Sequence, residues 1–356
     1  MPDTETNQFT DDPATTGRCT ATLITGAGGE IGHGLIEALS DAGRTDLVAL
    51  DLRELDAGLC RRCCASHVVD VRDEAGVEPI FERYEVTEIY HLAALLSTTA
   101  EKDPELAHAV NVGGTMNILT LAARYGLQHN RRIRVLFPST IAVYGLPDVE
   151  TRDRAGAIRE DQYAEPATMY GCNKRYCEDV GRYYSEHYRR LSSARGDLGP
   201  IDFRALRYPG IISAHTTPSG GTSDYFPEML HAAARGEPYA SFVAEDVRIP
   251  FMTMPDAVAA MLGLAAADEA RLTRRVYNVT SFNPTAGEYA GRIRDAFPGA
   301  DLTFAPDAAR ASIIDTWPAD IDDLSARRDW GWAPQHDLDA AFDDYLIPAI
   351  RARAGA

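Results

Sequence analysis

A glycine-rich turn between an apolar run and a helical pattern constrains this chain most. Residues 25–34 read TGAGGEIGHG, the apolar run 21–24 precedes them, and the helical pattern 35–39 follows. Glycines allow positive φ and a close approach of the backbone to a ligand, and the free N–H groups at a helix start favour an anion. The stretch therefore predicts a strand, a tight turn and a helix that together bind a diphosphate.

The spacing of the turn is Gly26-x-x-Gly29-x-x-Gly32, which departs from the dinucleotide fingerprint G-x-G-x-x-G because position 31 is Ile. The next apolar run ends in Asp51, about 20 positions beyond the last glycine, where a dinucleotide fold places the carboxylate that binds the ribose hydroxyls. Asp51 would repel a 2′-phosphate. These residues therefore predict NAD rather than NADP, a preference that Arg53 softens.

Short apolar runs alternate with helical patterns from Cys19 onward, which is typical of a parallel sheet with helices on both faces. We expect an α/β fold, a Rossmann-type doubly wound parallel sheet with a smaller C-terminal substrate lobe. Residues 1–18 are expected to be a disordered tail, 19–208 the NAD-binding domain, and 209–356 mainly the lobe, with some segments returning to the first domain. The expected strands are 20–25, 46–51, 67–70, 88–92, 133–138, 201–208 and 275–279, and the expected helices are 31–42, 75–84, 104–126 and 168–190.

The formal net charge of −18 argues against nucleic acid or an anionic membrane surface as a partner. Only Lys102 and Lys174 are lysines, and we expect an acidic surface that reflects either a GC-rich genome or a salt-adapted cytoplasm. No run of about 18 uncharged apolar residues and no signal-peptide pattern occur, so a cytoplasmic location is predicted. Cys60 and Cys63 form a C-x-x-C without a second ligand pair at finger spacing, so no metal is expected.

Tyr170 and Lys174 form a second motif, because residues at i and i+4 of a helix share one face. A free tyrosine titrates near about 10, but a neighbouring cation favours the phenolate and lowers its pKa. Tyr170 is therefore a candidate proton acceptor, although Y-x-x-x-K also arises by chance in amphipathic helices. Ser139 and Thr140 end an apolar run and offer a hydroxyl to a reacting oxygen, although such residues also serve as turns or caps.

The order of these motifs resembles that of the extended short-chain dehydrogenase/reductase superfamily, and within it the short-chain type of L-threonine 3-dehydrogenase. The likeness runs from about Cys19 to Tyr345. The stretches that carry it are IYHLAALLS at 89–97, EKDPELA at 101–107, FPSTIAVYG at 137–145, LRYPGIIS at 206–213, GGTSDY at 220–225 and WPADIDD at 317–323.

The resemblance implies a role for each matching residue. Tyr170 resembles the catalytic base, and Lys174 the residue that lowers its pKa and binds the nicotinamide ribose. Thr140, with Ser139 beside it, resembles the hydroxyl that holds the substrate oxygen. The implied NAD-binding residues are Gly26, Gly29, Glu30, Ile31, Gly32, Asp51, Arg53, Asp70, Val71, Asn111, Tyr170, Lys174 and Ile211, and the implied substrate-binding residues are Ser97, Thr140, Tyr170, Thr222 and Ser223.

Three further residues have two interpretations each. Arg207 is either an anchor for a substrate carboxylate or a member of a buried ion pair at a strand end. Trp317 either walls the pocket or packs in the core, and the second is favoured because large aromatic residues are mostly packing residues. His91 is interpreted as structural rather than as a ligand.

The implied reaction is the NAD-dependent oxidation of L-threonine at C3 to 2-amino-3-oxobutanoate, without a metal, in a homodimer that pairs through the helix beginning near Thr168. The alternative is a nucleotide-sugar 4-epimerase or dehydratase with tightly bound NAD. It would need basic residues in the lobe, where residues 220–225 offer small hydroxyls instead. A non-catalytic NAD(H) sensor of the same fold ranks third, because such proteins tend to lose the Tyr or the Lys.

Overall fold

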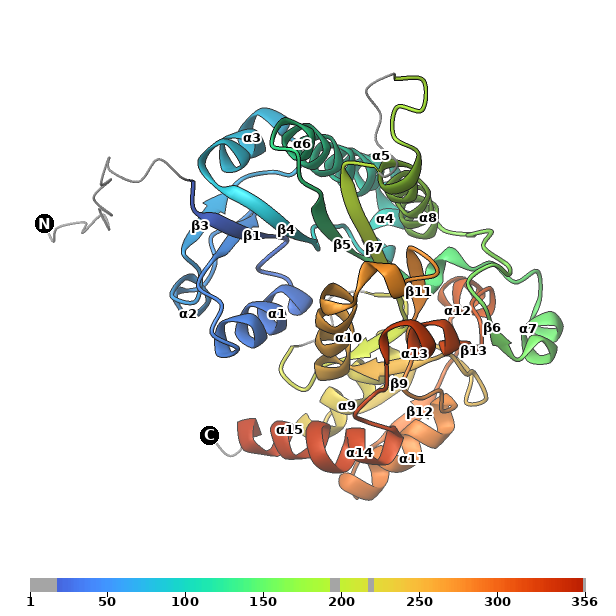
Figure 1. Cartoon of the computed structure of the whole chain (residues 1–356). Helices are drawn as coiled ribbons and strands as arrows, with labels where there is room; N and C mark the ends of the chain where they lie inside the picture. The colour runs from blue at the N-terminus through green and yellow to red at the C-terminus, as the bar shows by residue number, and fades with distance from the viewer. Residues whose placement is uncertain (1–17, 193–198, 217–220, 355–356) are drawn as a thin grey trace, which may run out of the picture.

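The computed structural model describes residues 18–192, 199–216 and 221–354. Within these ranges the centre of the molecule is a sheet of seven strands, and every neighbouring pair of them is parallel. Across the sheet the strands are, in order, β11 (Val276–Asn278), β7 (Ile201–Tyr208), β5 (Ile133–Thr140), β4 (Glu85–His91), β1 (Thr20–Thr25), β2 (Leu47–Asp51) and β3 (Ala65–Val68) (Figure 1). The chain runs outward from β1 to β3 and resumes at β4 on the other side of β1, so the predicted doubly wound sheet is confirmed.

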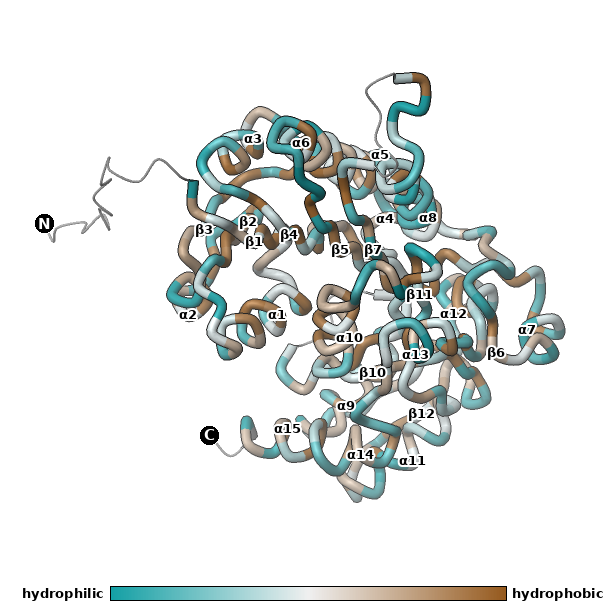
Figure 2. Tube along the Cα trace, in the orientation of Figure 1, coloured by the Kyte–Doolittle hydropathy of each residue, from teal (hydrophilic) through white to brown (hydrophobic). Residues whose placement is uncertain are grey.

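Helices cover both faces of this sheet (Figure 1). One face carries α3 (Glu74–Arg83), α6 (Thr115–Gln128) and α8 (Met169–Arg182), and the other carries α1 (Glu30–Asp41) and α10 (Met254–Ala266). Because successive side chains of a strand point to opposite faces, Leu23 packs in the core of the first face and Ile24 in the core of the second. Figure 2 shows the result as apolar colour along the central strands.

Besides the cores on the two faces of the sheet, a further hydrophobic core lies outside the sheet, and most of its residues come from the chain after β7. Its strands form small parallel pairs, in which β8 joins β10 and β9 joins β12, while β13 joins the earlier β6. Phe226 stacks on Tyr289 there, with ring centroids 3.8 Å apart. The elements of this part are β6 (Ala157–Ile158), β8 (Gly210–Ile212), α9 (Tyr225–Arg235), β9 (Tyr239–Ser241), β10 (Phe251–Thr253), α11 (Ala286–Ala296), β12 (Leu302–Phe304), α12 (Ala308–Asp315), β13 (Asp320–Ile321), α13 (Leu324–Trp330), α14 (Leu338–Ala340) and α15 (Ile347–Ala354).

Most of the remaining elements connect the strands of the main sheet. They are α2 (Ala57–Cys60), α4 (Ser97–Lys102), α5 (Pro104–His108), α7 (Val149–Ala155), the π-helical segments Ala109–Gly114 and Tyr183–His187, and the 3₁₀ segments Ile141–Val143 and Glu269–Arg271. A further π-helical segment, Ala341–Leu346, joins α14 to α15. The short helix α5 precedes α6, and the π-helical segment Ala109–Gly114 joins the two.

The seven expected strands correspond to the seven strands of the sheet, with shifts at their ends. The strand expected at 67–70 is β3, which lies earlier, at Ala65–Val68. The single helix expected over 104–126 is wrong, because the π-helical segment Ala109–Gly114 interrupts it. The expected helix 168–190 divides into α8 and a π-helical turn that ends at His187.

Several predictions fall on parts of the chain that the structure does not describe. The tail expected over residues 1–18 lies outside the described residues except for Arg18, and so does Gly220 of the implied substrate motif. Within the described ranges, the helices are too short or too polar for any of them to cross a lipid bilayer.

Candidate active site

The glycine turn between β1 and α1 has the geometry that a phosphate cradle needs. Gly26 has a φ of 67°, and a Cβ there would lie 2.6 Å from the backbone N of Ala93. A Cβ at Gly32 would lie 2.4 Å from the carbonyl oxygen of Ala27. Only glycine fits at these two positions, so the backbone of the turn packs tightly while the first N–H groups of α1 face the adjacent cavity.

Asp51 at the end of β2 lies against the same turn. Its Oδ2 accepts a hydrogen bond from the Gly28 N–H at 2.9 Å, and its Oδ1 accepts one from the Arg53 N–H at 3.1 Å. The carboxylate is thereby fixed beside the glycines. This arrangement fits NAD, with the diphosphate on the turn and a ribose hydroxyl at Asp51.

The main cavity, of about 450 Å³, lies at the carboxyl ends of the strands. Its walls come from the glycine turn, from the ends of β4, β5 and β7, from α8 and from the chain after β7. Of the expected site residues it is lined by Gly26, Gly29, Glu30, Ile31, Gly32, Arg53, Ser97, Ser139, Thr140, Tyr170, Lys174, Ile211, Thr222 and Ser223. The expected residues from Gly26 to Ser223 therefore meet at one cavity although they lie far apart in the sequence.

Of the expected site residues, Asp51, Asp70, Val71 and Asn111 do not line this cavity. Asp70 pairs with Arg72 at 2.6 Å, which holds the pKa of the Asp70 carboxyl below its usual range. The side-chain amide of Asn111 accepts a hydrogen bond from the Leu95 N–H at 2.7 Å and donates one to the Leu95 carbonyl at 3.0 Å. Asn111 therefore fixes the loop after β4 in this structure, and its predicted contact with the cofactor remains a prediction, as do those of Asp70 and Val71.

Thr140 and Ser139 end β5 and point in opposite directions, as neighbours in a strand must. The Oγ1 of Thr140 accepts a hydrogen bond from the Ala142 N–H at 3.1 Å and caps the 3₁₀ turn, which leaves its own O–H to donate into the cavity. The Ser139 hydroxyl instead donates to Oε1 of buried Glu178 at 2.5 Å. Ser139 also lines the cavity, so its expected contact with the substrate oxygen remains a prediction, and in this structure its hydroxyl is engaged with Glu178.

Helix α8 brings Tyr170 and Lys174 to the same place. Thr168 caps the helix by accepting a hydrogen bond from the Gly171 N–H at 3.1 Å. A Cβ at Gly171 would lie 2.1 Å from the carbonyl oxygen of Ala142, so the helix packs directly on the turn that follows Thr140. The Lys174 ammonium donates to the Pro138 carbonyl at 2.7 Å and lies 5.6 Å from the ring centroid of Tyr170.

Burial affects both members of this pair. It raises the pKa of the Tyr170 phenol above its usual value and lowers the pKa of Lys174 to about 8, because removal of water disfavours the charged form of each group. The role of Lys174 in lowering the pKa of Tyr170 during the reaction remains a prediction.

Ser97 and Thr222 meet across the cavity although they lie far apart in the sequence. The backbone N–H of Thr222 and its hydroxyl both donate to the Oγ of Ser97, at 3.0 and 2.9 Å. Both residues are buried. This contact joins the N-terminus of α4 to the segment before α9 and leaves the Ser97 hydroxyl free to donate.

The cavity wall also contains residues that were not among the expected site residues, and two of the polar ones are notable. Asp224 and Thr216 line it, and Asp224 also raises the pKa of Glu30, although burial is the larger cause. Asp224 directly follows the expected Thr222 and Ser223 in the sequence. A carboxylate beside two expected substrate-binding residues was the signal that could have identified it as a site residue. Trp317 is both 4% exposed and part of the cavity wall, so its two interpretations are not exclusive.

Arg207 and His91 both have structural partners. Arg207 is 1% exposed and forms an ion pair with Glu178 at 2.7 Å, so it is the buried ion pair rather than a carboxylate anchor. The two ring nitrogens of His91 contact the hydroxyls of Thr25 and Thr115, at 2.7 and 3.0 Å. The interpretation of His91 as structural is confirmed.

His91 predicts a specific acid sensitivity. Burial, together with the charge of Lys174, lowers its pKa from 6.5 to about 3. Because the pKa is lower in the folded protein than in the unfolded chain, the neutral ring favours folding above pH 6.5, and this stabilisation is lost as the pH falls from 6.5 toward 3, by up to roughly 5 kcal/mol. His91→Gln keeps a donor and an acceptor without titrating. We expect urea unfolding of the wild type to lose more free energy between pH 7 and 4 than that of the variant, and equal losses would contradict this.

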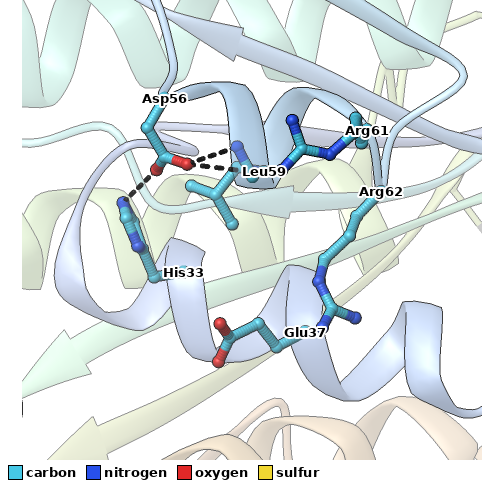
Figure 3. Close-up of a pocket in the computed structure, with 7 residues that line it drawn as sticks. His33, Glu37, Asp56, Leu59, Arg61 and Arg62 are labelled. Atoms are coloured by element: carbon cyan, nitrogen blue, oxygen red, sulfur yellow. Dashed lines mark hydrogen bonds and ion pairs between the residues drawn. The ribbon is translucent and has the colours of Figure 1, made fainter.

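A second hollow of about 410 Å³ lies between α1 and α2 (Figure 3). Two of its charged groups have partners: His33 lies 3.7 Å from Asp56 across the hollow, and Arg62 contacts Asp41 outside it at 2.5 Å. Asp56 also caps α2 through the N–H groups of the following turn. None of the expected site residues lines this hollow, so we assign it no role. Among the residues that the structure describes, no group of three or more metal-ligating side chains comes together.

The arrangement of cradle, carboxylate and Tyr/Lys helix agrees with comparisons with known proteins. Residues 22–280 match the NAD dependent epimerase/dehydratase family. The chain belongs to this family. The family is described as NAD dependent, and the glycine turn with Asp51 has the geometry that fits such a cofactor.

Among curated relatives, the chain is similar to an uncharacterized epimerase/dehydratase of Staphylococcus saprophyticus, with 34% identity over 94% of this chain and 98% of that one. It is also similar to the mitochondrial L-threonine 3-dehydrogenase of Bos taurus, with 33% identity over 89% of this chain and 79% of that one. The family and this dehydrogenase relative together support an NAD-dependent oxidoreductase and leave the substrate to be argued from the site.

Solved structures give the same picture. The holo form of a GalE-like L-threonine dehydrogenase from Cupriavidus necator matches with a TM-score of 0.79 and 34% identity, over 94% of this chain and 99% of that one. An L-threonine 3-dehydrogenase from a metagenome, described as monomeric, matches with a TM-score of 0.80 and 34% identity, over 93% of this chain and 99% of that one. The family thus includes a monomeric relative, and the predicted homodimer remains a prediction.

Proposed function

We propose that this protein oxidises L-threonine at C3 with NAD⁺ and forms 2-amino-3-oxobutanoate. The observation that carries the proposal is the convergence of Thr140, Tyr170 and Lys174 with the glycine turn at one cavity, whose opposite wall holds Ser97 and Thr222. Two similar solved structures are described as L-threonine dehydrogenases, which supports the choice of substrate.

Thr140, Tyr170 and Lys174 have different roles in the proposed reaction. The Thr140 hydroxyl, already anchored through Ala142, donates to the substrate's C3 oxygen. Tyr170 accepts the hydroxyl proton, and Lys174, held by Pro138, supplies a fixed positive charge beside it. NAD⁺ bound in the cradle supplies a hydride acceptor and a positive ring charge, which opposes the burial that raises the pKa of Tyr170.

The polar ends of the amino acid find complementary groups in the cavity. Hydroxyls of Ser97 and Ser223 suit its carboxylate, and Asp224 places a negative charge where an ammonium group is favourable. The Ser97–Thr222 contact holds two of these elements at a fixed separation. A small substrate with one charge of each sign therefore fits this wall.

A nucleotide-sugar epimerase or dehydratase is the second candidate, because the family includes such enzymes and the Staphylococcus relative carries that description. Its substrate adds a second diphosphate. The described lining residues after β7 include no Arg or Lys, and the cations of the wall are Arg53 beside the cofactor ribose and Lys174 beside Tyr170. This charge distribution favours the amino acid.

We expect NADH absorbance to grow when the purified protein is mixed with NAD⁺ and L-threonine, and not with L-serine or UDP-glucose in its place. NADP⁺ should react far more slowly, because Asp51 would face its 2′-phosphate.

Two further expectations are tested with the same protein. Measuring the rate of NADH formation at increasing KCl concentration tests the expected salt adaptation of the acidic surface, and light scattering measures the molecular mass and so tests the homodimer. Absence of NADH growth with threonine at every KCl concentration, or turnover of UDP-glucose instead, would reject the proposal.

A further inference from the structure

Glu178 is a buried acid on α8, one turn beyond Lys174, and both of its oxygens are engaged. Oε1 accepts from the Ser139 hydroxyl at 2.5 Å and from Arg207 Nε at 2.9 Å. Oε2 accepts from Arg207 Nη2 at 2.7 Å and from Arg175 Nη1 at 3.2 Å. The side chain is 1% exposed, so its charge is compensated within the protein.

Arg207 cannot serve the cavity, because its donors are already used. Its Nη1 donates to the Glu160 carbonyl at 2.8 Å and to the Tyr144 hydroxyl at 3.0 Å, and its other nitrogens contact Glu178. It lies opposite Ser139 in the register of β5 and β7. Glu178 is therefore held by two neighbouring strands at once.

Two successive turns of α8 are thus fixed to two successive residues of β5. Lys174 donates to the Pro138 carbonyl and Glu178 accepts from Ser139. The next residue of the strand is Thr140, and the preceding turn of the helix carries Tyr170. Residues at i, i+4 and i+8 share one helix face, so this face aligns Tyr170 with the strand end.

We propose that Glu178 is a positioning residue: it docks α8 on the end of β5 so that Tyr170 and Thr140 face one substrate oxygen, and its charge keeps the buried Lys174 protonated. The positioning role rests on the proposed function, whereas the effect on Lys174 is a property of the protein alone. Glu178 itself does not line the cavity and makes no contact with substrate.

The groups around Lys174 support the electrostatic part. Burial lowers its pKa to about 8, while the charges of Cys177 and Glu178 on the same helix act in the opposite direction. The Phe137 ring of β5 lies 4.4 Å from the ammonium.

Two groups on other strands complete the surroundings. His91 of β4 is kept neutral partly by the charge of Lys174. Arg207 of β7 is paired with Glu178. Neutralising Glu178 would leave the Arg207 cation uncompensated and remove an attraction that favours protonated Lys174, so the pKa of Lys174 must fall further.

The chain offers a direct measurement, because Lys102 and Lys174 are its only lysines. Labelling lysine with ¹³C at the ε position gives two NMR signals, and exposed Lys102 serves as the internal reference. In full-length protein without substrate, we expect Glu178→Gln to move the Lys174 midpoint down by about one pH unit or more. Glu178→Asp should restore much of it.

Asp202→Asn is the matched control, because Asp202 is a buried acid that pairs with Arg204 on β7 at 2.7 Å and also with Arg134 and Arg275, none of which belongs to α8. It should leave the Lys174 midpoint unchanged. An unmoved midpoint in folded Glu178→Gln, or an equal shift in the control, would overturn the electrostatic role. Failure of the threonine assay would not affect this result.

Ser139→Ala tests the docking role and keeps the proposal falsifiable if Glu178→Gln does not fold. It removes one hydrogen bond to Glu178 and no charge. With L-threonine we expect kcat to fall about tenfold, KM to change less than about twofold, and the Lys174 midpoint to stay in place. An unchanged kcat, or a rise of KM alone, would overturn the docking role.

Discussion

Replacing Tyr170 with Phe is expected to lower kcat for L-threonine by roughly 10²–10⁴-fold, which is the range that a positioned proton acceptor contributes. The ring remains, so the packing of α8 on the turn after Thr140 should persist. The phenol oxygen is the only group removed, and it is the proposed acceptor of the substrate proton. NADH formation measures kcat, and calorimetric titration measures the affinity for NAD⁺, which should change little.

Tyr176→Phe is the control for this variant. Tyr176 lies on the same helix, its side chain is half exposed, and it does not line the cavity. It should retain wild-type turnover. If Tyr170→Phe kept most of the turnover, the assignment of the proton acceptor would be wrong; if it also lost NAD⁺ binding, the loss of turnover would not report on proton transfer.

Gly26→Ala is expected to have the second large effect, on cofactor binding and on stability together. The added Cβ would lie 2.6 Å from the Ala93 nitrogen, and φ at this position is 67°. The turn must then shift or the neighbouring strand end must move. Overpacking of this kind costs about 1–3 kcal/mol, so the affinity for NAD⁺ should fall about tenfold or more.

Gly43→Ala separates the contact from the backbone strain. Gly43 has a φ of 86°, and no atom lies within 4 Å of its added Cβ. Both variants therefore place alanine at positive φ, at a cost of about 1–2 kcal/mol, and only the first creates an overlap. Urea unfolding measures the loss of stability in each variant, and NAD⁺ titration measures the loss of cofactor affinity. Equal losses would show that strain alone, and not the close approach at the cradle, limits this position.

The main sheet could be predicted because its signals are local. Each strand is a short apolar run bounded by turn residues, and the sequence pattern marked all seven strands of the main sheet. The interruption at Ala109–Gly114 was missed, since the apolar spacing there is compatible with an unbroken helix. The chain after β7 was predicted only as a lobe, because its strands of two or three residues are too short to show a period.

The sequence predicted which residues line the main cavity better than it predicted their hydrogen-bond partners. Fourteen expected residues line the main cavity, since strand ends of a parallel sheet meet at one edge. The partner of Ser139, by contrast, is Glu178 on a helix far along the chain. Asn111 was expected near the cofactor, and its amide holds the backbone of Leu95.

The sequence by itself determined the doubly wound sheet, the glycine cradle with Asp51, and the pairing of Tyr170 with Lys174, because each depends on spacings within one strand, turn or helix. Only the tertiary structure decided the direction of the Ser139 hydroxyl, the buried pairing of Arg207 and the raised pKa of Tyr170. These properties depend on which faces pack together and on how much water the packing removes, and desolvation acts on a charge through every element that surrounds it.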